Sequence, residues 1–593
     1  MCGIVGYIGE REAQPVLVNS LKRLEYRGYD SCGLALLGAN VEVYKDVIRI
    51  GALERTLRPN GSHIGIGHTR WATHGKPSQI NAHPHLDCSG KIAVVHNGVI
   101  DNFLRLKEQL TREGHTFRSE TDTEVIPHLI EKYYQGDLGQ AVSRTAADIK
   151  GSYAFIAVHI DCQQLAVARN ESPLIVGIGD RENIVASDVP AVLDYTDRVV
   201  YLEDGDVGLI SKDEIRLTNN GEPVKRAEHR IPWSIEEAQK AGHEHFMIKE
   251  IHEQPKAIQN TFKGYISAIE PVVNLGIRRD IDFSNILILA CGSSYHAALV
   301  GKHVIQRLAQ IPVRVEIASE FNYSDTMLSK TWVIAITQSG ETADCLKALK
   351  RAREFDCNTL VITNVVGSSA TRIAEEILYI IAGPEICVAA TKSFITQLVV
   401  LYLLALALAS ADVRTRTSMI AGLRQLPGKV QEVLDREGEI ADYGKYLAGY
   451  ENVFFIARGI NFPIALEGAL KLKEIAYIRA EGFPAGELKH GPLALFMPET
   501  PVIAIVARDN TYEPLLANIK EIKARESPVI AIAEEDDEIS KYVDFVIRVP
   551  RVDPIFSPVV NSVAVQLLAY YTAKERGCPI DTPRNLAKSV TVE

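Results

Sequence analysis

The chain has 593 residues, of which 46% are hydrophobic and 23% are charged. This length exceeds what one hydrophobic core usually holds, so three or four domains are expected. The formal net charge is −11 and no block of Lys and Arg offsets it, which argues against a nucleic-acid partner. An anionic small substrate remains compatible with this charge, because a pocket can be locally positive.

The nine cysteines include no Cys-x-x-Cys pair, which favours free thiols in a reducing compartment. The opening residues lack the basic and apolar regions of a signal peptide. The most apolar stretch, Leu398–Ala409, has twelve residues, whereas a membrane span needs about 18 or more. We therefore expect a buried core helix there and a cytoplasmic protein.

Residues 2–220 are rich in predicted strands, with helical patterns only at Gln14–Leu24 and Thr123–Tyr134. The pattern predicts a mixed α/β layered domain and not a series of βαβ units. Residues 221–275 are more polar and are predicted to be a connector, with helices at Ser234–Gln239 and His245–Thr261.

From residue 276 onward, apolar strands such as ILILACG and WVIAIT alternate with longer helices, which indicates parallel sheets with crossover helices. The pattern occurs twice. Aligning Gly292 with Gly459 without gaps brings identical residues together at six positions. This predicts a duplicated α/β domain at 276–416 and 443–584, followed by a tail at 585–593.

Cys2 is a candidate nucleophile if Met1 is removed, because it would then carry a thiol and a free α-amine. An α-amine with a pKa of about 7.7–8.0 can act as a base near neutral pH. The alternative is that Cys2 is only a small buried hydrophobic residue.

Four further motifs accompany Cys-Gly-Ile-Val-Gly at the start of the chain. They are RGYDS at 27–31, HTRWATHG at 68–75, HNG at 96–98 and TDTE at 121–124. Together with Cys2 they resemble the class II glutamine amidotransferases, whose glutaminase domain has the N-terminal-nucleophile αββα sandwich fold.

This resemblance implies that Cys2 attacks the glutamine amide while Asn97 and the Gly98 N–H form an oxyanion hole. It implies a glutamine-binding set in which the first residue pairs with the α-carboxylate and the last with the α-ammonium: Arg70, Trp71, Thr73, His74 and Asp122. Taken singly, these residues have ordinary alternatives, namely a hairpin turn at Asn97–Gly98, a surface charge at Arg70 and a helix N-cap at Asp122.

In the first repeat, TQSGET at 337–342 and CGSS at 291–294 each follow a strand and precede a helix. Small hydroxyl residues and glycine there suit a phosphate, because backbone N–H groups and the helix dipole point at it. The alternative is a plain strand–turn–helix connection with serine caps. Neither segment has the GxxxxGK[ST] pattern, so ATP is not predicted.

The second repeat places Glu467, Lys471 and Glu474 on one helix face. On its own this pattern usually forms a solvated ladder of ion pairs. It is followed by AGELKHGP at 485–492, which contains His490, and the chain ends in PRNLAKSVTVE.

These segments, together with ATKSFITQ and ALEGALKLKEIAYI, resemble the amidotransferases in which a glutaminase domain precedes two doubly wound sugar-isomerase (SIS) domains. The resemblance implies that D-fructose 6-phosphate and L-glutamine become D-glucosamine 6-phosphate and L-glutamate. It also implies an internal ammonia channel gated by Trp71, and a homodimer.

By the same resemblance, Lys588 forms a Schiff base with the ketone, Glu474 moves a proton between carbons 1 and 2, and His490 assists ring opening from the partner subunit. The implied sugar-phosphate-binding set is Ser294, Thr337, Gln338, Ser339, Thr342, Val388, Glu467, Lys471 and Ala587. The family usually has Ser where this chain has Thr337; the hydroxyl is retained.

No metal or organic cofactor is expected, because no His/Cys cluster has ligand spacing and GxGxxG is absent. Two rivals remain. One is an amidotransferase that aminates a phosphoribosyl diphosphate, which would need a different C-terminal half. The other is a sugar-phosphate sensor without activity, against which the retention of Glu474, His490 and Lys588 argues.

Overall fold

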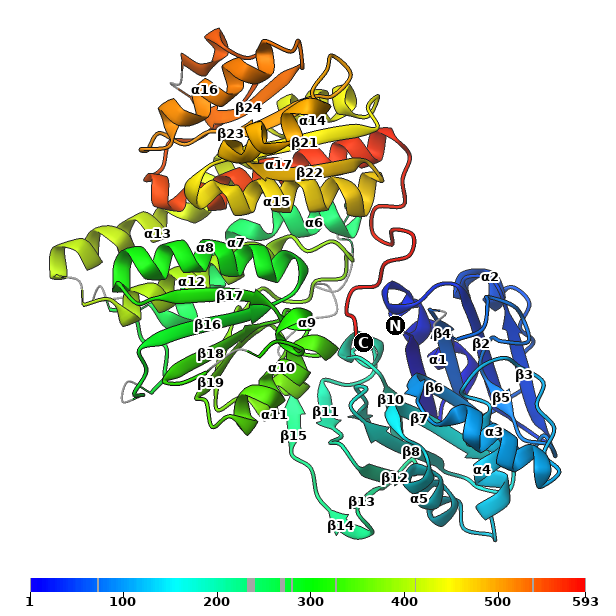
Figure 1. Ribbon diagram of the computed structural model, residues 1–593. Helices are drawn as coiled ribbons and strands as arrows, with labels where there is room; N and C mark the ends of the chain where they lie inside the picture. Colours follow the sequence, from blue (N-terminus) through cyan, green and yellow to red (C-terminus); the bar gives the residue numbers. More distant parts are fainter. Residues whose placement is uncertain are drawn as a thin grey trace. The chain divides into compact units, whose positions relative to one another are not determined.

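The computed structural model describes nine stretches of the chain: 2–71, 74–231, 240, 242–266, 272–278, 281–325, 328–410, 412–535 and 538–591. Two compact units are present (Figure 1). Residues Met1–Ala238 and the tail Ala587–Glu593 form the first unit, and residues Gln239–Leu586 form the second.

The first unit contains two antiparallel sheets. One has the strand order β15-β11-β9-β10-β1-β4-β2-β3. Its strands are β1 (Gly3–Gly9), β2 (Ser31–Leu37), β3 (Val41–Asp46), β4 (Ile64–Arg70), β9 (Ile175–Ile178), β10 (Glu182–Ala186), β11 (Arg198–Tyr201) and β15 (Glu228–Arg230). The other has the order β14-β13-β12-β8-β7-β6-β5. Its strands are β5 (His85–Leu86), β6 (Ile92–Ile100), β7 (Gly151–His159), β8 (Leu165–Asn170), β12 (Asp206–Ile210), β13 (Ile215–Asn219) and β14 (Glu222–Val224).

Alternating apolar residues of both sheets, including Ile4, Ile66, Val95 and Ile156, face one another in a buried core. A second core lies between the β6 sheet and its covering helices. Those helices are α3 (Phe103–Arg112), α4 (Val125–Tyr133) and α5 (Leu138–Asp148), while α1 (Ala13–Lys22) and α2 (Ile50–Glu54) contact the β1 sheet. The predicted layered α/β fold is confirmed as an αββα sandwich.

The prediction of only two helices in this unit is wrong, because α2, α3 and α5 are also helical. α2 has five residues, too few for a periodic pattern. α3 is polar on average and buries only Leu106 and Leu110, so its apolar stripe is narrow.

The second unit contains two parallel five-stranded sheets, ordered β17-β16-β18-β19-β20 and β22-β21-β23-β24-β25. The first comprises β16 (Asn285–Ala290), β17 (Val313–Ile317), β18 (Thr331–Ile336), β19 (Thr359–Thr363) and β20 (Glu376–Tyr379). The second comprises β21 (Asn452–Ala457), β22 (Arg479–Pro484), β23 (Val502–Ile505), β24 (Val529–Glu534) and β25 (Phe545–Val549). Both have the chain order 2-1-3-4-5, which confirms the predicted duplication.

Helices cover both sheets and share one large core between the repeats. They are α6 (Phe246–His252), α7 (Gln254–Tyr265), α8 (Gly292–Ala309), α9 (Ala318–Phe321), α10 (Ala343–Glu354), α11 (Ser369–Ile373), α12 (Lys392–Leu408), α13 (Val413–Leu434), α14 (Glu437–Leu447), α15 (Phe462–Lys471), α16 (Tyr512–Lys523) and α17 (Ser557–Glu575). The aligned glycines Gly301 and Gly468 permit close packing, since a Cβ there would lie 2.8 Å from Leu401 and 2.5 Å from Phe455.

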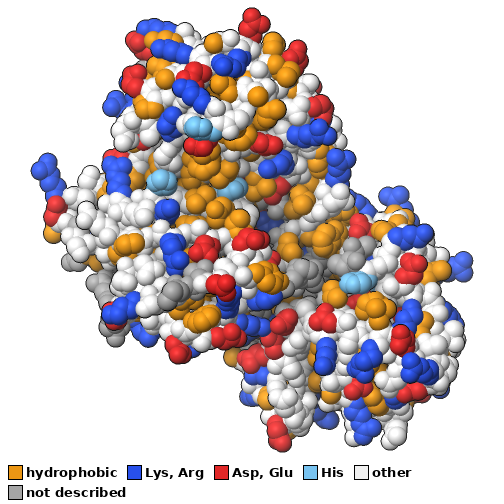
Figure 2. Space-filling model, in the orientation of Figure 1, with side chains coloured by type: hydrophobic (Ala, Val, Ile, Leu, Met, Phe, Trp, Pro, Cys, Tyr) orange, Lys and Arg blue, Asp and Glu red, His pale blue; other side chains and the backbone are white. Residues whose placement is uncertain are grey.

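The apolar stretch Leu398–Ala409 forms most of α12, which is buried almost throughout and so confirms the predicted core helix. Among the described helices, Pro554–Glu575 has the length and composition to cross a membrane, but 94% of its apolar window is buried inside the protein. On the face shown in Figure 2, acidic and basic side chains are interspersed.

The predicted connector range contributes to both units. β14 and β15 pair with β13 and β11 of the first unit, and α7 packs against α12 and α13 of the second. The single helix expected at His245–Thr261 is instead α6 and α7, because Pro255 lacks an N–H and is favoured in a first helical turn. The helix expected at Ser234–Gln239 lies outside the described residues.

Candidate functional site

Cys2 precedes β1, a central strand flanked by β10 and β4. The register pairs Gly3 with Thr69, so Cys2 meets the end of β4. Its thiol contacts the Trp71 backbone, with Sγ 3.5 Å from the carbonyl oxygen and 3.3 Å from the nitrogen that donates to it. Burial raises the pKa of the Cys2 thiol, while the amino-terminal charge, the Trp71 N–H and Arg70 oppose that rise.

Asn97 and Gly98 lie within β6 and are paired with Ala154 and Tyr153 of β7, which excludes the hairpin-turn alternative. The Asn97 side-chain Nδ2 donates to the Cys2 carbonyl oxygen at 2.8 Å. Gly98 has φ +119, and a Cβ there would lie 1.9 Å from the Ser152 oxygen. The strand therefore fixes an amide donor beside Cys2 and requires glycine next to it.

Arg70 is 4% exposed, which excludes the surface-charge alternative. Its Nη2 donates to the carbonyl oxygens of His74 and, at 3.0 Å, Gly75. Its buried Nη1 has no hydrogen-bond partner among the described residues. Burial lowers the pKa of Arg70, while the negative charges of Cys2 and Asp122 counteract that effect. An unused guanidinium donor beside Cys2 suits an incoming carboxylate.

Asp122 is 4% exposed and does not cap α4, whose N-cap position is Glu124. One carboxylate oxygen of Asp122 accepts the Ile100 N–H at 2.8 Å. Glu124 holds the preceding loop, since its oxygens accept the backbone N–H groups of Arg118 at 2.8 Å and Ser119 at 2.6 Å. The loop thus places the Asp122 carboxylate near Arg70.

The remaining predicted glutamine-binding residues belong to the loop after β4. Trp71 is half-buried, and the His74 ring meets Phe103 edge-on at a centroid distance of 5.6 Å. Thr73 lies outside the described residues. The structure therefore brings Cys2, Arg70, Trp71, Asn97 and Asp122 together.

Several supporting residues were not predicted. Arg27 donates to the Cys2 carbonyl oxygen at 3.4 Å and to Asp188 at 2.6 Å. His68, two residues before Arg70 on β4, is buried, and its Nε2 lies 3.0 Å from the backbone oxygen of His96. Burial lowers the pKa of His68 to about 3 and that of His96 to about 4, so both rings are neutral at physiological pH. The quoted RGYDS and HTRWATHG motifs contain Arg27 and His68 but give no sign of these contacts.

The strand order of the first SIS repeat creates a topological switch point between β16 and β18. In doubly wound sheets, ligands bind at the carboxyl ends of the strands at this point. The two predicted phosphate loops follow β16 and β18, so the fold brings both loops to the same place.

The loop 337–342 is closed by its own hydroxyl groups and leads into the twelve-residue α10. Thr337 Oγ1 lies 2.9 Å from Thr342 Oγ1 and accepts the Gly340 N–H at 3.3 Å. Ser339 Oγ accepts the Glu341 N–H at 3.1 Å, and the Gln338 oxygen accepts the Asn364 N–H at 3.0 Å. The turn thus directs a helix N-terminus and several hydroxyls to one spot, as an anion site requires.

Of two further predicted sugar-binding residues, Ser294 belongs to the loop 291–294, whereas Val388 lies in a later segment of the first repeat. Ser294, in the first turn of α8, accepts a hydrogen bond from Gln397 Nε2 of α12 at 3.0 Å. Val388 is half-buried and its N–H donates to the Asp581 oxygen at 3.2 Å. The Ser294 hydroxyl is therefore fixed in position by a side chain of α12, which a plain strand–turn–helix connection would not require.

Glu467 and Lys471 of α15 are both fully buried, so the solvated-ladder alternative is wrong. The Lys471 ammonium lies 3.3 Å from Glu467 Oε1 and 2.5 Å from Glu474 Oε2. Burial disfavours the Glu467 carboxylate, but Lys471 and His296 hold its pKa below the ordinary value. The same two carboxylates keep the pKa of Lys471 raised against burial.

Glu467 also joins the two repeats. Its oxygens accept from Ser293 Oγ at 2.9 Å and lie 2.8 Å from His296 Nδ1, both on α8 of the first repeat. A buried carboxylate of the second repeat therefore contacts α8, the helix that begins at the predicted phosphate loop 291–294.

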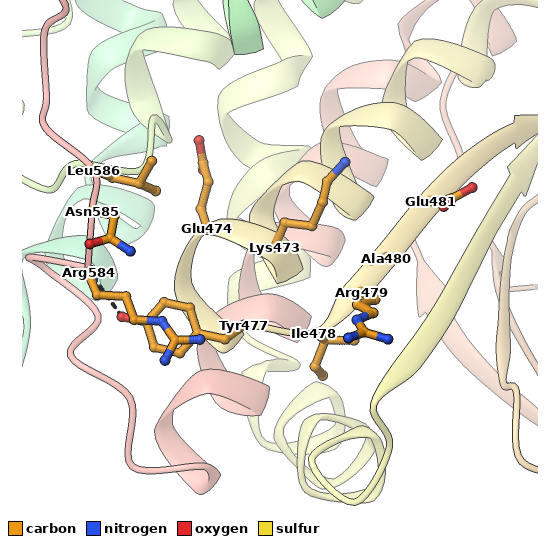
Figure 3. Close-up of a pocket in the computed structure, with 10 residues that line it drawn as sticks. All are labelled: Lys473, Glu474, Tyr477, Ile478, Arg479, Ala480, Glu481, Arg584, Asn585 and Leu586. Atoms are coloured by element: carbon orange, nitrogen blue, oxygen red, sulfur yellow. Dashed lines mark hydrogen bonds between the residues drawn. The ribbon is translucent and has the colours of Figure 1, made fainter.

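Glu467, Lys471 and Glu474 form a row of ion pairs, and Glu474, the last of them, lines a pocket of about 510 Å³ (Figure 3). Glu474 lines it from the short π-helical segment Leu472–Ala476, together with Tyr477. Arg584 covers the Tyr477 ring at 4.1 Å, and its N–H donates to the tyrosine hydroxyl at 2.8 Å. The start of the tail, up to Leu586, thus closes one side of the pocket beside Glu474.

The tail residues Ala587 and Lys588 follow directly and are half-buried, but they belong to the residue set of the first unit. His490 ends a short 3-10 segment, Ala485–His490, and is exposed to solvent. His490 does not line the pocket that contains Glu474. Its predicted role is therefore not tested within one chain.

The sequence shows no metal-ligand spacing, and no metal was expected on that ground. The fold nevertheless brings four possible ligands together from distant parts of the first unit. Cys88, His115, His128 and Glu131 bring their ligand atoms within 4.8 Å of one another. Their positions in three separate segments explain why the sequence did not reveal them.

Comparison with known proteins is consistent with both halves of the site. A glutamine amidotransferase domain model matches residues 68–194, and an SIS domain model matches residues 281–407 and 446–576. The C-terminal domain of glucosamine-fructose-6-phosphate aminotransferase from Francisella tularensis has 36% identity and a TM-score of 0.56, covering 58% of this chain and 100% of that one.

Full-length relatives are similar over their whole length. The glutamine–fructose-6-phosphate aminotransferase (isomerizing) of Methanosarcina acetivorans is 50% identical over 618 aligned residues, and that of Thermococcus kodakarensis is 48% identical over 608. Each alignment covers 100% of both chains.

A thiol at the head of a central strand, an amide donor beside it and two SIS domains in sequence define a glutamine amidotransferase joined to a sugar-phosphate isomerase half. At this identity over its full length, the chain belongs to the family of glutamine–fructose-6-phosphate aminotransferases (isomerizing).

Substituting Gly98→Ala should lower both the rate of glutamine hydrolysis and the thermal midpoint of unfolding. The new Cβ would clash with the Ser152 carbonyl, and φ +119 is unfavourable for alanine. Glutamate release and a thermal melt measure the two effects. Gly51→Ala in α2 is the matched control, because nothing lies within 4 Å of its added Cβ; equal behaviour of the two variants would contradict the strand geometry.

Substituting Lys471→Met should destabilise the second unit by about 3–5 kcal/mol, because Glu467 would remain buried without its cation. Urea unfolding measures the loss. Lys489→Met, which removes an ion pair to Glu521 at a Lys side chain that is 61% exposed, should cost no more than about 1 kcal/mol. Adding Glu467→Gln to Lys471→Met should restore part of the stability, and a larger loss would contradict the buried-pair interpretation.

Proposed function

We propose that the two halves of the site divide the family reaction between them, with Cys2 releasing ammonia from glutamine and the SIS half using it. The reaction of the chain is the synthesis of D-glucosamine 6-phosphate and L-glutamate from D-fructose 6-phosphate and L-glutamine. The single observation that supports this assignment of the two half-reactions is the contact of Asn97 Nδ2 with the Cys2 carbonyl oxygen, at 2.8 Å, in a glutaminase-type sandwich.

In the first half-reaction, the Cys2 thiolate attacks the side-chain amide carbon of glutamine. The free α-amine of Cys2, once Met1 is removed, takes the thiol proton and passes it to the leaving ammonia. Water then hydrolyses the γ-glutamyl thioester to glutamate. The contact of the thiol with the Trp71 N–H supports this role, since that donor favours the thiolate.

The oxyanion of the tetrahedral intermediate would be held by Asn97 Nδ2 and the Gly98 N–H. Both donors are fixed by β6, whose pairing with β7 runs through these two residues. Donors that need no reorganisation stabilise charge most where water is excluded, and one such donor contributes about 2.7–4 kcal/mol.

Glutamine would be oriented by charges at its other end. The partnerless Nη1 of Arg70 suits the α-carboxylate, and Asp122, which shares a buried environment with Arg70, suits the α-ammonium. Trp71, Thr73 and His74 belong to the loop that would close over the substrate.

Fructose 6-phosphate would place its phosphate at the switch point of the first repeat. Donors there come from the loop 337–342 with Thr337, Gln338, Ser339 and Thr342, and from Ser294 on α8. Val388 and Ala587 complete the binding set by analogy with the family. Thr337 keeps the hydroxyl that the family's Ser provides and uses it to close the loop.

The carbonyl chemistry would begin with the Lys588 amine attacking C2 of the open-chain sugar, with loss of water. Ammonia then replaces Lys588 at C2 and regenerates the free amine. Glu474 moves a proton from C1 to C2 while the C1 hydroxyl proton passes to the nitrogen, and together these transfers convert the ketose imine to the amino sugar aldehyde. The position of Glu474 on the pocket wall, with Lys471 2.5 Å away, supports this assignment.

Ring opening would be assisted by His490 of a second subunit. Within one chain His490 is exposed and does not line the Glu474 pocket, which is what a residue donated across a homodimer interface requires. The rival phosphoribosyl amidotransferase is disfavoured because both SIS domains are present.

Cys2→Ala should abolish glutamine-dependent synthesis of glucosamine 6-phosphate while leaving synthesis from added ammonium salts. The variant loses only the nucleophile that releases ammonia. Product formation with each nitrogen source, followed by chromatography, measures this. Retained glutamine use would defeat the assignment of Cys2, and failure with both nitrogen sources would point to a folding defect.

Lys588→Ala should lose synthesis by at least about 10³-fold while glutamine hydrolysis continues, because only the imine-forming amine is removed. Borohydride reduction in the presence of fructose 6-phosphate should add the mass of one sugar phosphate to the wild type and none to the variant. Normal turnover by the variant would contradict the Schiff base. Lys473→Ala, on the same pocket, serves as the control.

A further inference from the structure

Four side chains with metal-ligand chemistry meet on the first unit, and none of them is among the groups placed around Cys2. Cys88 lies in the turn between β5 and β6, and His115 lies in the loop after α3. His128 and Glu131 lie three residues apart on α4, which places them on one helix face. Three separate segments therefore converge on one point.

Three of the distances between the ligand atoms match those around one tetrahedral ion. The Cys88 sulfur lies 3.6 Å from His128 Nδ1 and 3.8 Å from His115 Nδ1. Glu131 Oε2 lies 3.4 Å from His128 Nδ1. With bonds of about 2.3 Å to sulfur and about 2.0–2.1 Å to nitrogen or oxygen, a tetrahedral zinc ion separates such atoms by about 3.6 Å and about 3.4 Å, respectively.

One separation is shorter. His115 Nδ1 and Glu131 Oε2 lie 2.8 Å apart, as in a hydrogen bond that an ion would replace. Binding would then require the Cys88 thiol to release its proton to solvent, and each imidazole to carry its proton on Nε2.

The surroundings already hold these ligands in place. The Thr116 N–H donates to the Cys88 sulfur at 3.3 Å, and the Cys88 N–H donates to Glu131 at the same distance. The His128 side chain is 1% exposed and the Phe117 ring meets it edge-on at 4.6 Å.

A second carboxylate stands behind one of the imidazoles. His128 Nε2 has no hydrogen-bond partner, and Glu124 Oε1 lies 3.9 Å from it. Histidines that bind a metal through one nitrogen usually direct the other N–H to a carboxylate. The arrangement therefore places a carboxylate on the side of His128 that faces away from the ligand cluster, where a short movement would form this hydrogen bond.

We propose that Cys88, His115, His128 and Glu131 form a structural Zn²⁺ site. A thiolate with two imidazoles selects a borderline or soft divalent ion over Mg²⁺ or Ca²⁺, which prefer oxygen ligands. Four protein ligands leave no open position for a substrate, so the ion has a structural role and no part in the amidotransferase chemistry.

The ion would restrain the loop that carries Asp122, a proposed glutamine-binding residue. His128 lies one turn after Glu124, whose carboxylate holds the backbone of Arg118 and Ser119 and so shapes the loop that carries Asp122. An ion that ties α4 to the Cys88 turn and to His115 would restrict this loop from both ends. The effect on glutamine rests on the proposed role of Asp122, whereas the metal site itself does not.

The test uses full-length protein purified without chelator and without a metal-affinity tag. Elemental mass spectrometry should find about one zinc per chain in the wild type and in Cys162→Ala, a half-buried cysteine of the same unit that contacts Tyr134. Cys88→Ala should retain less than a tenth of this zinc. Cys88 is exposed, so its loss leaves no buried cavity.

Cobalt provides a second measurement that does not depend on the metal content after purification. The apo-protein titrated with Co²⁺ should develop the visible absorption of tetrahedral cobalt and a thiolate charge-transfer band, and Cys88→Ala should lack the latter. Equal zinc in wild type and Cys88→Ala, or cobalt bound without a thiolate band, would overturn the proposal.

The bracing of the Asp122 loop is tested separately. Removing the zinc with a chelator should lower the thermal midpoint of the first unit and raise the KM for glutamine several-fold, with little change in kcat. Cys88→Ala should behave like the apo-protein and be insensitive to the chelator. A metal site without any effect on KM would leave the ion established and refute its link to glutamine binding.

Discussion

The buried carboxylate of Glu467 is the contact on which the arrangement of the SIS half depends. A fully buried charge is tolerable only when partners replace water, and here Lys471, Ser293 and His296 do so. Because these partners come from α15 and from α8, the contact fixes the position of one repeat against the other. The contact lies on α8, which begins within the predicted phosphate loop 291–294, and Lys471 connects it to Glu474 on the pocket wall. Glu467, Lys471 and Glu474 therefore join the contact between the repeats to the residue that the proposed function uses for proton transfer.

The glutaminase half follows a different principle, in which backbone pairing holds the groups and some polar atoms are left unused. β6 fixes Asn97 and Gly98, while β1 and β4 bring Cys2 to Trp71. Arg70 Nη1 and Asn97 Oδ1 are buried and have no hydrogen-bond partner within the part of the chain that the structure describes. An unsatisfied buried group costs about 1–3 kcal/mol, so these atoms mark the place where a polar substrate would restore the lost hydrogen bonds.

The sequence predicted what depends on periodicity and on contiguous motifs. The duplication, the parallel sheets and the core helix α12 follow from apolar patterns, and Cys2, Arg70 and Asn97 lie in short motifs. It could not predict contacts between distant segments. The bond of Glu467 to α8 and the cluster around Cys88 each join residues whose separation in sequence carries no signal. The burial of Lys471 was equally hidden, since its spacing is also that of an exposed ladder.

The two SIS repeats share a strand order, yet only the first carries a loop rich in hydroxyls at its switch point. In the second repeat the loop after β23 contains Asp509, whose carboxylate accepts the Thr511 N–H at 2.8 Å and the Thr511 hydroxyl at 2.6 Å. An internal carboxylate thus occupies the N-terminus of α16, where a phosphate would bind in the first repeat. After β21, Arg458 donates to Asn518 at 2.9 Å. In the proposed function, the duplicated fold therefore uses one sugar-phosphate site instead of two, and the second copy supplies α15, its buried charges and Glu474.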